Sequence, residues 1–162
     1  MQLVIADTGP VNYLLLIGHI EILPALFERV ILPSAVKDEL ANPDTPLLVR
    51  NWIAAPPSWV NVRHTEKPLP NISMAGLGAG ETEAITLAVE LHADLLLMDD
   101  RRGVTVALQR GLTVTGTMGL LARAAKHGLL DLAAAFDRLK QTNFRYRQEI
   151  MEQLLKEGSD TA

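Results

Sequence analysis

Acidic side chains follow two apolar segments that have the length of short strands. Asp7 comes directly after Leu3–Ala6, and Asp99 and Asp100 come directly after Leu95–Met98. Parallel sheets place their ligands at the carboxyl ends of the strands, near the point where the strand order reverses. If these two strands are neighbours, their backbones lie about 4.8 Å apart. Carboxylates about 5 Å apart repel by roughly 3 kcal/mol at an effective dielectric of 20, so we expect a cation or a proton between them.

Further acids belong to helices that should begin near the same edge. Glu39 lies in the predicted helix Ser34–Leu40, and Glu81 and Glu83 open the predicted helix Glu81–Leu91. All of these groups are oxygen donors; the chain has no Cys, and its four His include no pair spaced to bind a metal. Oxygen-only ligation favours Mg²⁺ or Mn²⁺ over zinc. A carboxylate-held pair of such ions suits phosphodiester hydrolysis, because one ion activates water while the other stabilises the leaving oxygen.

Each acid also has a simpler interpretation. Asp7 and the pair Asp99–Asp100 could cap the helices that follow them, a frequent role for Asp. Glu81 would be favoured by the positive end of its own helix dipole, and Glu39 could be a solvated neighbour of Lys37. The joint occurrence of these acids at one sheet edge favours the metal site.

The elements that must position these acids alternate along the chain. The predicted strands are Leu3–Ala6, Val30–Leu32, Trp59–Val62, Leu95–Met98 and Leu112–Val114. The predicted helices are Pro10–Ile17, Ile20–Phe27, Ser34–Leu40 with Ser34 as its cap, Pro46–Ile53, Glu81–Leu91, Val104–Gln109, Leu120–Ala125, Leu132–Leu139 and Gln148–Leu155. This alternation predicts a three-layer α/β/α fold around a central parallel sheet of about five strands. We expect one domain over residues 1–157 and a flexible tail over 158–162.

Five motifs in this order resemble the PIN-domain family of metal-dependent nucleases. The resemblance spans roughly residues 2–155 and is to a bacterial and archaeal PIN-like branch related to ribonuclease toxins of toxin–antitoxin systems. The motifs that carry it are Ile5–Pro10, Ala35–Leu40, Gly80–Ala88, Leu97–Gly103 and Val114–Leu121.

The resemblance implies a catalytic and metal-binding set of acids. Asp100 is preferred over its neighbour for the last place, because family members often put this acid one residue beyond the strand end. Glu83 is the alternative to Glu81, and Thr8 is expected to fix Asp7 or a metal-bound water through its hydroxyl group. The implied ligands of Mg²⁺ or Mn²⁺ are Asp7, Glu39, Glu81 and one of Asp99 and Asp100.

The activity that this resemblance implies is hydrolysis of single-stranded RNA by a metal-dependent endoribonuclease. Because relatives include toxins of toxin–antitoxin pairs, it also implies an antitoxin as a partner, a homodimer and a cytoplasmic location. The alternative is a non-catalytic PIN-like interaction module, in which the acids serve only as helix caps.

The composition is that of a globular chain, with 48% apolar and 21% charged residues. No apolar run is long enough to span a membrane, and no signal peptide is visible at the start. The net charge of −4 argues mildly against a general nucleic-acid binder. That charge is uneven, however: residues 1–100 carry −8 and residues 101–162 carry +4. A metal that neutralised the five candidate acids would remove the objection.

Basic residues of the last third could therefore hold phosphate groups. Arg101 and Arg102 directly follow the acidic pair and are expected to bind the substrate. The run Arg145–Arg147, which includes Tyr146, offers together with Phe144 both charge and rings for stacking, although a turn that packs Phe144 into the core is the simpler interpretation.

Overall fold

The computed structural model describes residues 2–67, 69–72 and 76–160. Within these residues five parallel strands form one sheet in the order β3-β2-β1-β4-β5. The predicted parallel sheet is confirmed, and each strand lies within two residues of its expected bounds. The strands are β1 (Val4–Ala6), β2 (Val30–Pro33), β3 (Val60–Arg63), β4 (Leu95–Leu97) and β5 (Val114–Thr115).

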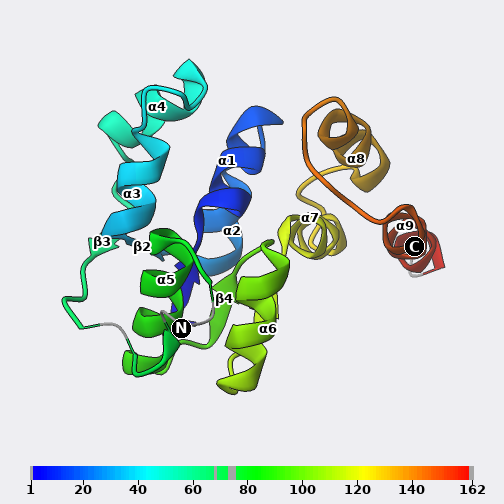
Figure 1. Cartoon of the computed structure of the whole chain (residues 1–162). Helices are drawn as coiled ribbons and strands as arrows, with labels where there is room; N and C mark the ends of the chain where they lie inside the picture. Colours follow the sequence, from blue (N-terminus) through cyan, green and yellow to red (C-terminus); the bar gives the residue numbers. More distant parts are fainter. Residues whose placement is uncertain (1, 68, 73–75, 161–162) are drawn as a thin grey trace.

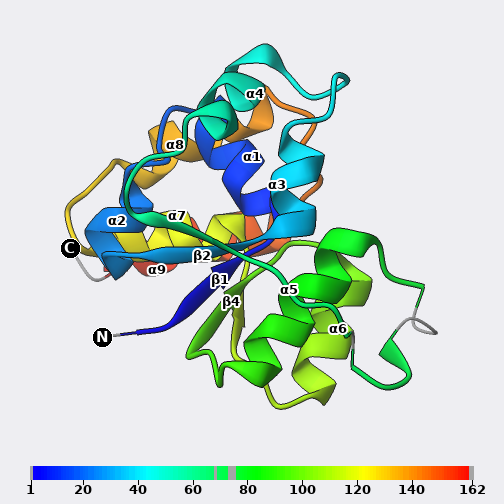
Figure 2. The ribbon, with the colours of Figure 1, turned by 90° about the vertical axis from the view of Figure 1, so that its left-hand side faces the viewer.

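Helices cover both faces of this sheet, which confirms the three layers (Figures 1 and 2). Helices α5 and α6 cover one face, and the remaining helices lie on the other (Figure 2). None of the helices described is long and apolar enough to cross a membrane. The helices are α1 (Thr8–Leu16), α2 (Ile22–Phe27), α3 (Ser34–Leu40), α4 (Leu47–Ala54), α5 (Ala79–Glu90), α6 (Arg101–Gln109), α7 (Thr117–Lys126), α8 (Leu132–Lys140) and α9 (Gln148–Asp160).

Side chains of the central strands alternate between two apolar cores, because successive residues of a strand point to opposite faces. In β1, Val4 packs into the core under α1 and α7, whereas Ile5 packs into the core under α5 and α6. In β4, Leu97 faces the first core and Leu96 the second. Burial on both faces explains why these strands read as continuous apolar runs.

The strand order reverses between β1 and β4, which is the point where such sheets bind ligands. The chain leaves β1 toward β2 and β3 on one side, and β4 and β5 follow on the other side. Ile5 pairs with Leu96, and the Asp7 N–H donates a hydrogen bond to the Leu97 carbonyl at 2.9 Å. The two acid-bearing strands are therefore neighbours, which the sequence left open, and they end side by side.

Helix α9 continues through Asp160, so its last turn covers part of the segment that the sequence analysis expects to be a tail. The Ser159 hydroxyl group donates to the Lys156 carbonyl at 2.9 Å, and the backbone of Gly158 lies close to the Leu132 side chain. These contacts hold the last turn of the helix beyond residue 157. Residues 161–162 lie outside the described range.

Candidate metal centre

Asp7 stands at the end of the central strand and its carboxylate is buried, with 4% of its surface exposed. It occupies the cap position of α1, yet its side chain makes no capping hydrogen bond. Its Oδ1 is a buried oxygen without a hydrogen-bond partner among the described residues, an arrangement that is rare in native structures. The helix-cap interpretation is therefore wrong for Asp7.

The surroundings of Asp7 disfavour its negative charge. Burial raises its pKa to about 7 against the opposing effect of the Thr8 backbone N–H, and the charges of Glu81, Glu39 and Asp100 raise it further. A buried carboxylate surrounded by three others needs a proton or a cation. The four acids that the sequence selects as a set are those that act on one another here.

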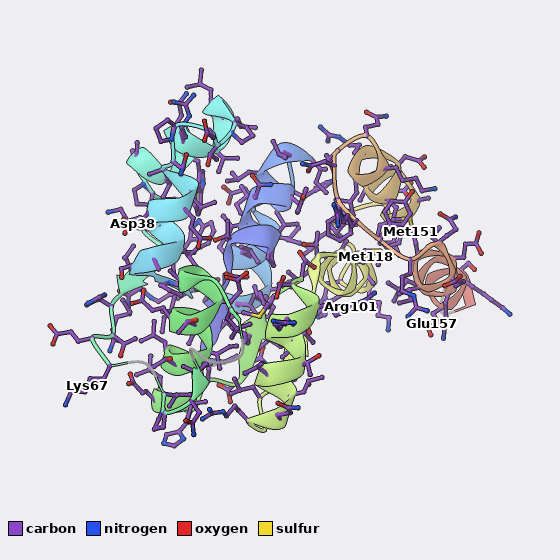
Figure 3. The ribbon with its side chains drawn as sticks, viewed as in Figure 1. Asp38, Lys67, Arg101, Met118, Met151 and Glu157 are labelled. Atoms are coloured by element: carbon purple, nitrogen blue, oxygen red, sulfur yellow. The ribbon has the colours of Figure 1, made fainter. Side chains whose placement is uncertain are left out.

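Glu39 reaches the centre from α3 and is held by the starts of two other helices. The Thr8 hydroxyl group donates to its Oε2 at 2.5 Å, and the Gly80 N–H donates to its Oε1 at 3.1 Å. A methyl group at Gly80 would lie 2.7 Å from Oε1, so this approach requires glycine. The expectation that the Thr8 hydroxyl fixes Asp7 is wrong, because Glu39 takes that bond. Asp38, next to Glu39, is exposed and points outward from α3 (Figure 3).

Glu81 and Asp100 meet at Gly103 in the first turn of α6. A methyl group at Gly103 would lie 3.3 Å from Asp100 Oδ2 and 3.5 Å from Glu81 Cγ. Burial raises the pKa of Glu81 against a hydrogen bond from its own backbone N–H, and the charges of Asp100 and Glu39 raise it further. Asp100 also caps α6, since its Oδ2 accepts a hydrogen bond from the Gly103 N–H at 2.8 Å. That cap explains why α6 begins at Arg101, three residues earlier than the sequence predicts.

The structure does not bring Asp99 into this cluster. Its Oδ1 accepts from the Thr117 N–H at 2.7 Å, and its Oδ2 accepts from the Thr117 hydroxyl group at 2.5 Å. Burial raises the pKa of Asp99, although both bonds from Thr117 oppose the shift. Successive side chains of an extended segment point to opposite sides, so Asp99 faces α7 while Asp100 faces α5.

Glu83 also points away from the cluster, so it does not substitute for Glu81. It accepts hydrogen bonds from the Ser34 hydroxyl (2.7 Å), the Ala35 N–H (2.8 Å) and the Thr65 N–H (3.2 Å), and His64 Nδ1 lies 3.1 Å away. Burial opposes its ionisation, but these bonds together hold its pKa below the ordinary value. Ser34 is thus not the cap of α3 that the sequence predicts; Pro33 takes that position, and Glu83 binds the free N–H of Ala35.

The two arginines predicted beside the acids lie in different surroundings. The Arg102 guanidinium lies against Gly76, in the segment before α5. Arg101 is exposed and lies on the side of α6 that faces α7 (Figure 3). It lines a cavity of about 680 Å³ whose other walls the sequence did not assemble: Tyr13, Asp99, Asp100, Asn143, Phe144 and Arg145.

The four clustered acids fit a hard divalent cation by their chemistry. They offer oxygen atoms alone, they repel one another, and Asp7 presents a buried oxygen that no group of the described residues satisfies. Among the described residues no three acidic or histidine side chains already surround a common point. The fit therefore lies in donor type, charge and the unsatisfied oxygen, and not in a preformed cage.

A five-stranded parallel sheet with acids at its switch point is compatible with several α/β domains, and comparison with known proteins identifies the family. The chain belongs to the DUF3368 family of PIN domains, whose model matches residues 3–160. PIN domains are generally metal-dependent nucleases. A similar solved structure is that of a PilT N-terminus domain protein from the hyperthermophilic archaeon Sulfolobus solfataricus P2. It shares 16% identity at a TM-score of 0.53 and covers 90% of this chain and 99% of its own. Comparison with curated proteins gives no match.

The pKa of Asp7 predicts how the stability of the metal-free protein depends on pH. Because folding raises this pKa from 3.8 to about 7, the native state holds a proton that the unfolded chain has lost, and stability falls as pH rises through this window. The full shift corresponds to roughly 4 kcal/mol. The variant Asp7→Asn lacks this titrating group. In EDTA its free energy of unfolding should therefore increase relative to that of the wild type as the pH rises from 5 to 8. A difference independent of pH would contradict the assignment.

Because their environments shift the pKa in opposite directions, replacing Glu81 or Glu83 with Gln should change stability in opposite directions. Glu81→Gln should stabilise the metal-free protein at pH 8, because it removes a carboxylate whose ionisation the fold disfavours. Glu83→Gln should destabilise it by about 1–3 kcal/mol, because Gln replaces one of the accepting oxygens with an NH₂ group. Chemical denaturation in EDTA measures both, and shifts of the same sign would show that the two environments are misassigned.

Proposed function

We propose that this protein is a metal-dependent endoribonuclease that hydrolyses phosphodiester bonds of single-stranded RNA. The observation that carries the proposal is the buried, unsatisfied Oδ1 of Asp7, which lies among the carboxylates of Glu39, Glu81 and Asp100. Such a cluster is costly unless a cation neutralises it, and the family of the chain is generally one of metal-dependent nucleases. The choice of RNA rests on the resemblance to ribonuclease toxins.

In this proposal the four acids hold Mg²⁺ or Mn²⁺. The ion, when bound, supplies a Lewis acid that neutralises charge on the phosphate and lowers the pKa of water. Glu39 is kept in place by the Thr8 hydroxyl group and the Gly80 N–H, and Asp100 by the Gly103 N–H. Arg101 is exposed and lines a cavity together with Asp100, and in this proposal its guanidinium binds a phosphate oxygen of the substrate.

The biological setting is proposed from the same resemblance. It comprises a role as the toxin of a toxin–antitoxin pair, an antitoxin protein as partner, a homodimer and a cytoplasmic location. The protein can be purified with and without the product of the neighbouring gene. Size-exclusion chromatography with light scattering then measures whether it forms a homodimer and whether it binds that product.

Binding of Mn²⁺ should stabilise the protein and support cleavage. At a hundredfold excess over its dissociation constant a ligand contributes about 2.7 kcal/mol, which raises the Tm of a domain of this size by about 5–10 °C. We expect this shift, and Mn²⁺-dependent cleavage of single-stranded RNA, in the wild type and not in Asp7→Asn or Glu39→Gln. Asp38→Asn is the matched control because Asp38 points away from the centre.

Cleavage in EDTA, or an active Asp7→Asn variant, would contradict the nuclease proposal. A folded wild-type protein with neither a Mn²⁺-induced shift nor cleavage would favour the alternative, a PIN-like interaction module that has kept the fold without the chemistry.

Asp99 and Asp100 should differ in the same assays. Asp100→Asn is expected to lose the Mn²⁺-induced shift and the cleavage, because it removes a charge from the cluster. Asp99→Asn should lower the Tm in EDTA, because it weakens the two bonds to Thr117, while the Mn²⁺-induced shift persists. The reverse pattern would make Asp99 the ligand.

A further inference from the structure

The cavity of about 680 Å³ beside the acid cluster is built from three parts of the chain that are distant in sequence. Tyr13 comes from α1, Asp99, Asp100 and Arg101 from the turn between β4 and α6, and residues 143–145 from the connection between α8 and α9. In Figure 1 this connection, drawn in orange, runs down beside α8 to α9. Asp100 belongs both to the cavity wall and to the group of carboxylates that act on Asp7. The cavity therefore adjoins the proposed metal centre directly.

Two guanidinium groups, those of Arg101 and Arg145, line this cavity. Arg101 and Arg145 form no salt bridge within the residues that the structure describes, and both are exposed. Other arginines have evident protein partners: Arg110 donates to the Pro70 carbonyl, and Arg123 lies over the ring of Phe27. Two arginines that face an open cavity next to a hydrolytic centre are suited to phosphate groups, which guanidinium binds in a bidentate manner.

The same cavity has an aromatic wall and an amide. The rings of Tyr13 and Phe144 meet edge to face, with centroids 4.9 Å apart, and Phe144 packs partly against the core. The Tyr13 hydroxyl group donates to Asn143 Oδ1 at 2.9 Å, which fixes the orientation of the amide. Phe144 thus has the packing role that the simpler interpretation of the sequence gives it, and it also lines the cavity. Its ring stacks on that of Tyr146, with centroids 6.4 Å apart and planes 9° apart, so a base that stacks here would extend an existing aromatic pair.

We propose that this cavity binds one nucleotide of the single-stranded substrate, next to the phosphate that is cleaved. Arg101 and Arg145 bind the phosphates on its two sides, and Phe144 stacks on its base. The volume lies within the roughly 300–1,000 Å³ range of small-ligand sites, and aromatic stacking is the usual means of holding an unpaired base. This proposal rests on the proposed nuclease function and adds to it the site where the single-stranded RNA binds.

Binding can be separated from cleavage by working in the Asp7→Asn background in EDTA. Fluorescence anisotropy with a short fluorescein-labelled single-stranded RNA measures affinity at several salt concentrations. Arg101→Ala with Arg145→Ala should weaken binding on the order of tenfold and reduce the slope of log affinity against log salt by about 1.4, since each phosphate contact on a single strand contributes about 0.7. The charge-matched control, Arg110→Ala with Lys156→Ala, should keep the slope.

Phe144→Leu tests stacking without removing the apolar packing of that side chain. It should weaken binding about fivefold or more while the salt slope stays unchanged, a combination that neither lost charge nor partial unfolding produces. The Tm of each variant in EDTA provides the check on folding.

Three results would overturn the nucleotide site. They are absence of RNA binding by the Asp7→Asn protein, an unchanged affinity in the double arginine variant, and equal losses in that variant and its control. If the wild type then still cleaves RNA with Mn²⁺, only the site fails and the nuclease proposal stands. If the cavity variants lose binding while the wild type shows no metal-dependent cleavage, the site stands as a single-strand binding site and the nuclease proposal fails.

Discussion

The structure at this sheet edge depends on one unfavourable interaction, the burial of the Asp7 carboxylate among other carboxylates. Asp7 ends the central strand, where both sheet faces are covered and water has little access. Its neighbours Glu39, Glu81 and Asp100 add repulsion to the cost of burial. Folded proteins retain such an arrangement where a bound cation offsets the cost or where function requires it.

Backbone and side-chain groups hold that arrangement without neutralising it. The starts of α1 and α5 bind Glu39, and the start of α6 binds Asp100. Glycine at position 80 lets the Glu39 carboxylate come this close to α5, and at position 103 an added methyl group would first meet Met98 Sδ, at 2.6 Å, and then Asp100 Oδ2, at 3.3 Å. Glu83, two residues from Glu81, has the opposite environment, since its carboxylate is satisfied by donors from α3 and from the segment after β3. One helix therefore carries a structural acid and a candidate ligand on different sides.

The fold and the meeting of Asp7, Glu39 and Glu81 at one sheet edge could be predicted from local patterns in the sequence, whereas the preference for Asp100 over Asp99 came from the family resemblance. Continuous apolar runs mark strands buried on both faces, and an acid directly after such a run must lie at the sheet edge. The choice between Asp99 and Asp100 needed the register: Ile5 pairs with Leu96, so Asp7 and Asp100 lie on the same face as Ile5 and Leu96, and Asp99 lies on the other. No short-range pattern gives that register.

Long-range hydrogen bonds could not be predicted either, because no short-range pattern shows which distant residues meet. Thr8 and Glu39 are 31 residues apart, and Ser34 and Glu83 are 49 apart, so the local signals for capping and for metal support pointed to the wrong partners. The cavity wall made by Tyr13 and Asn143 joins residues 130 positions apart. The signal that was present in the sequence was the combination of ring and charge in Phe144 and Arg145.

The central claim is that the unsatisfied oxygen of Asp7 is completed by a divalent cation. A crystal of the protein soaked in Mn²⁺ tests it most directly, because the anomalous signal of manganese locates the ion without any assumption about activity. The account predicts an anomalous peak in contact with Asp7 Oδ1 and with carboxylate oxygens of the other three clustered acids. A manganese peak at Asp99 or Glu83 would contradict it. So would the absence of a peak beside Asp7 in a crystal soaked at a saturating concentration of Mn²⁺.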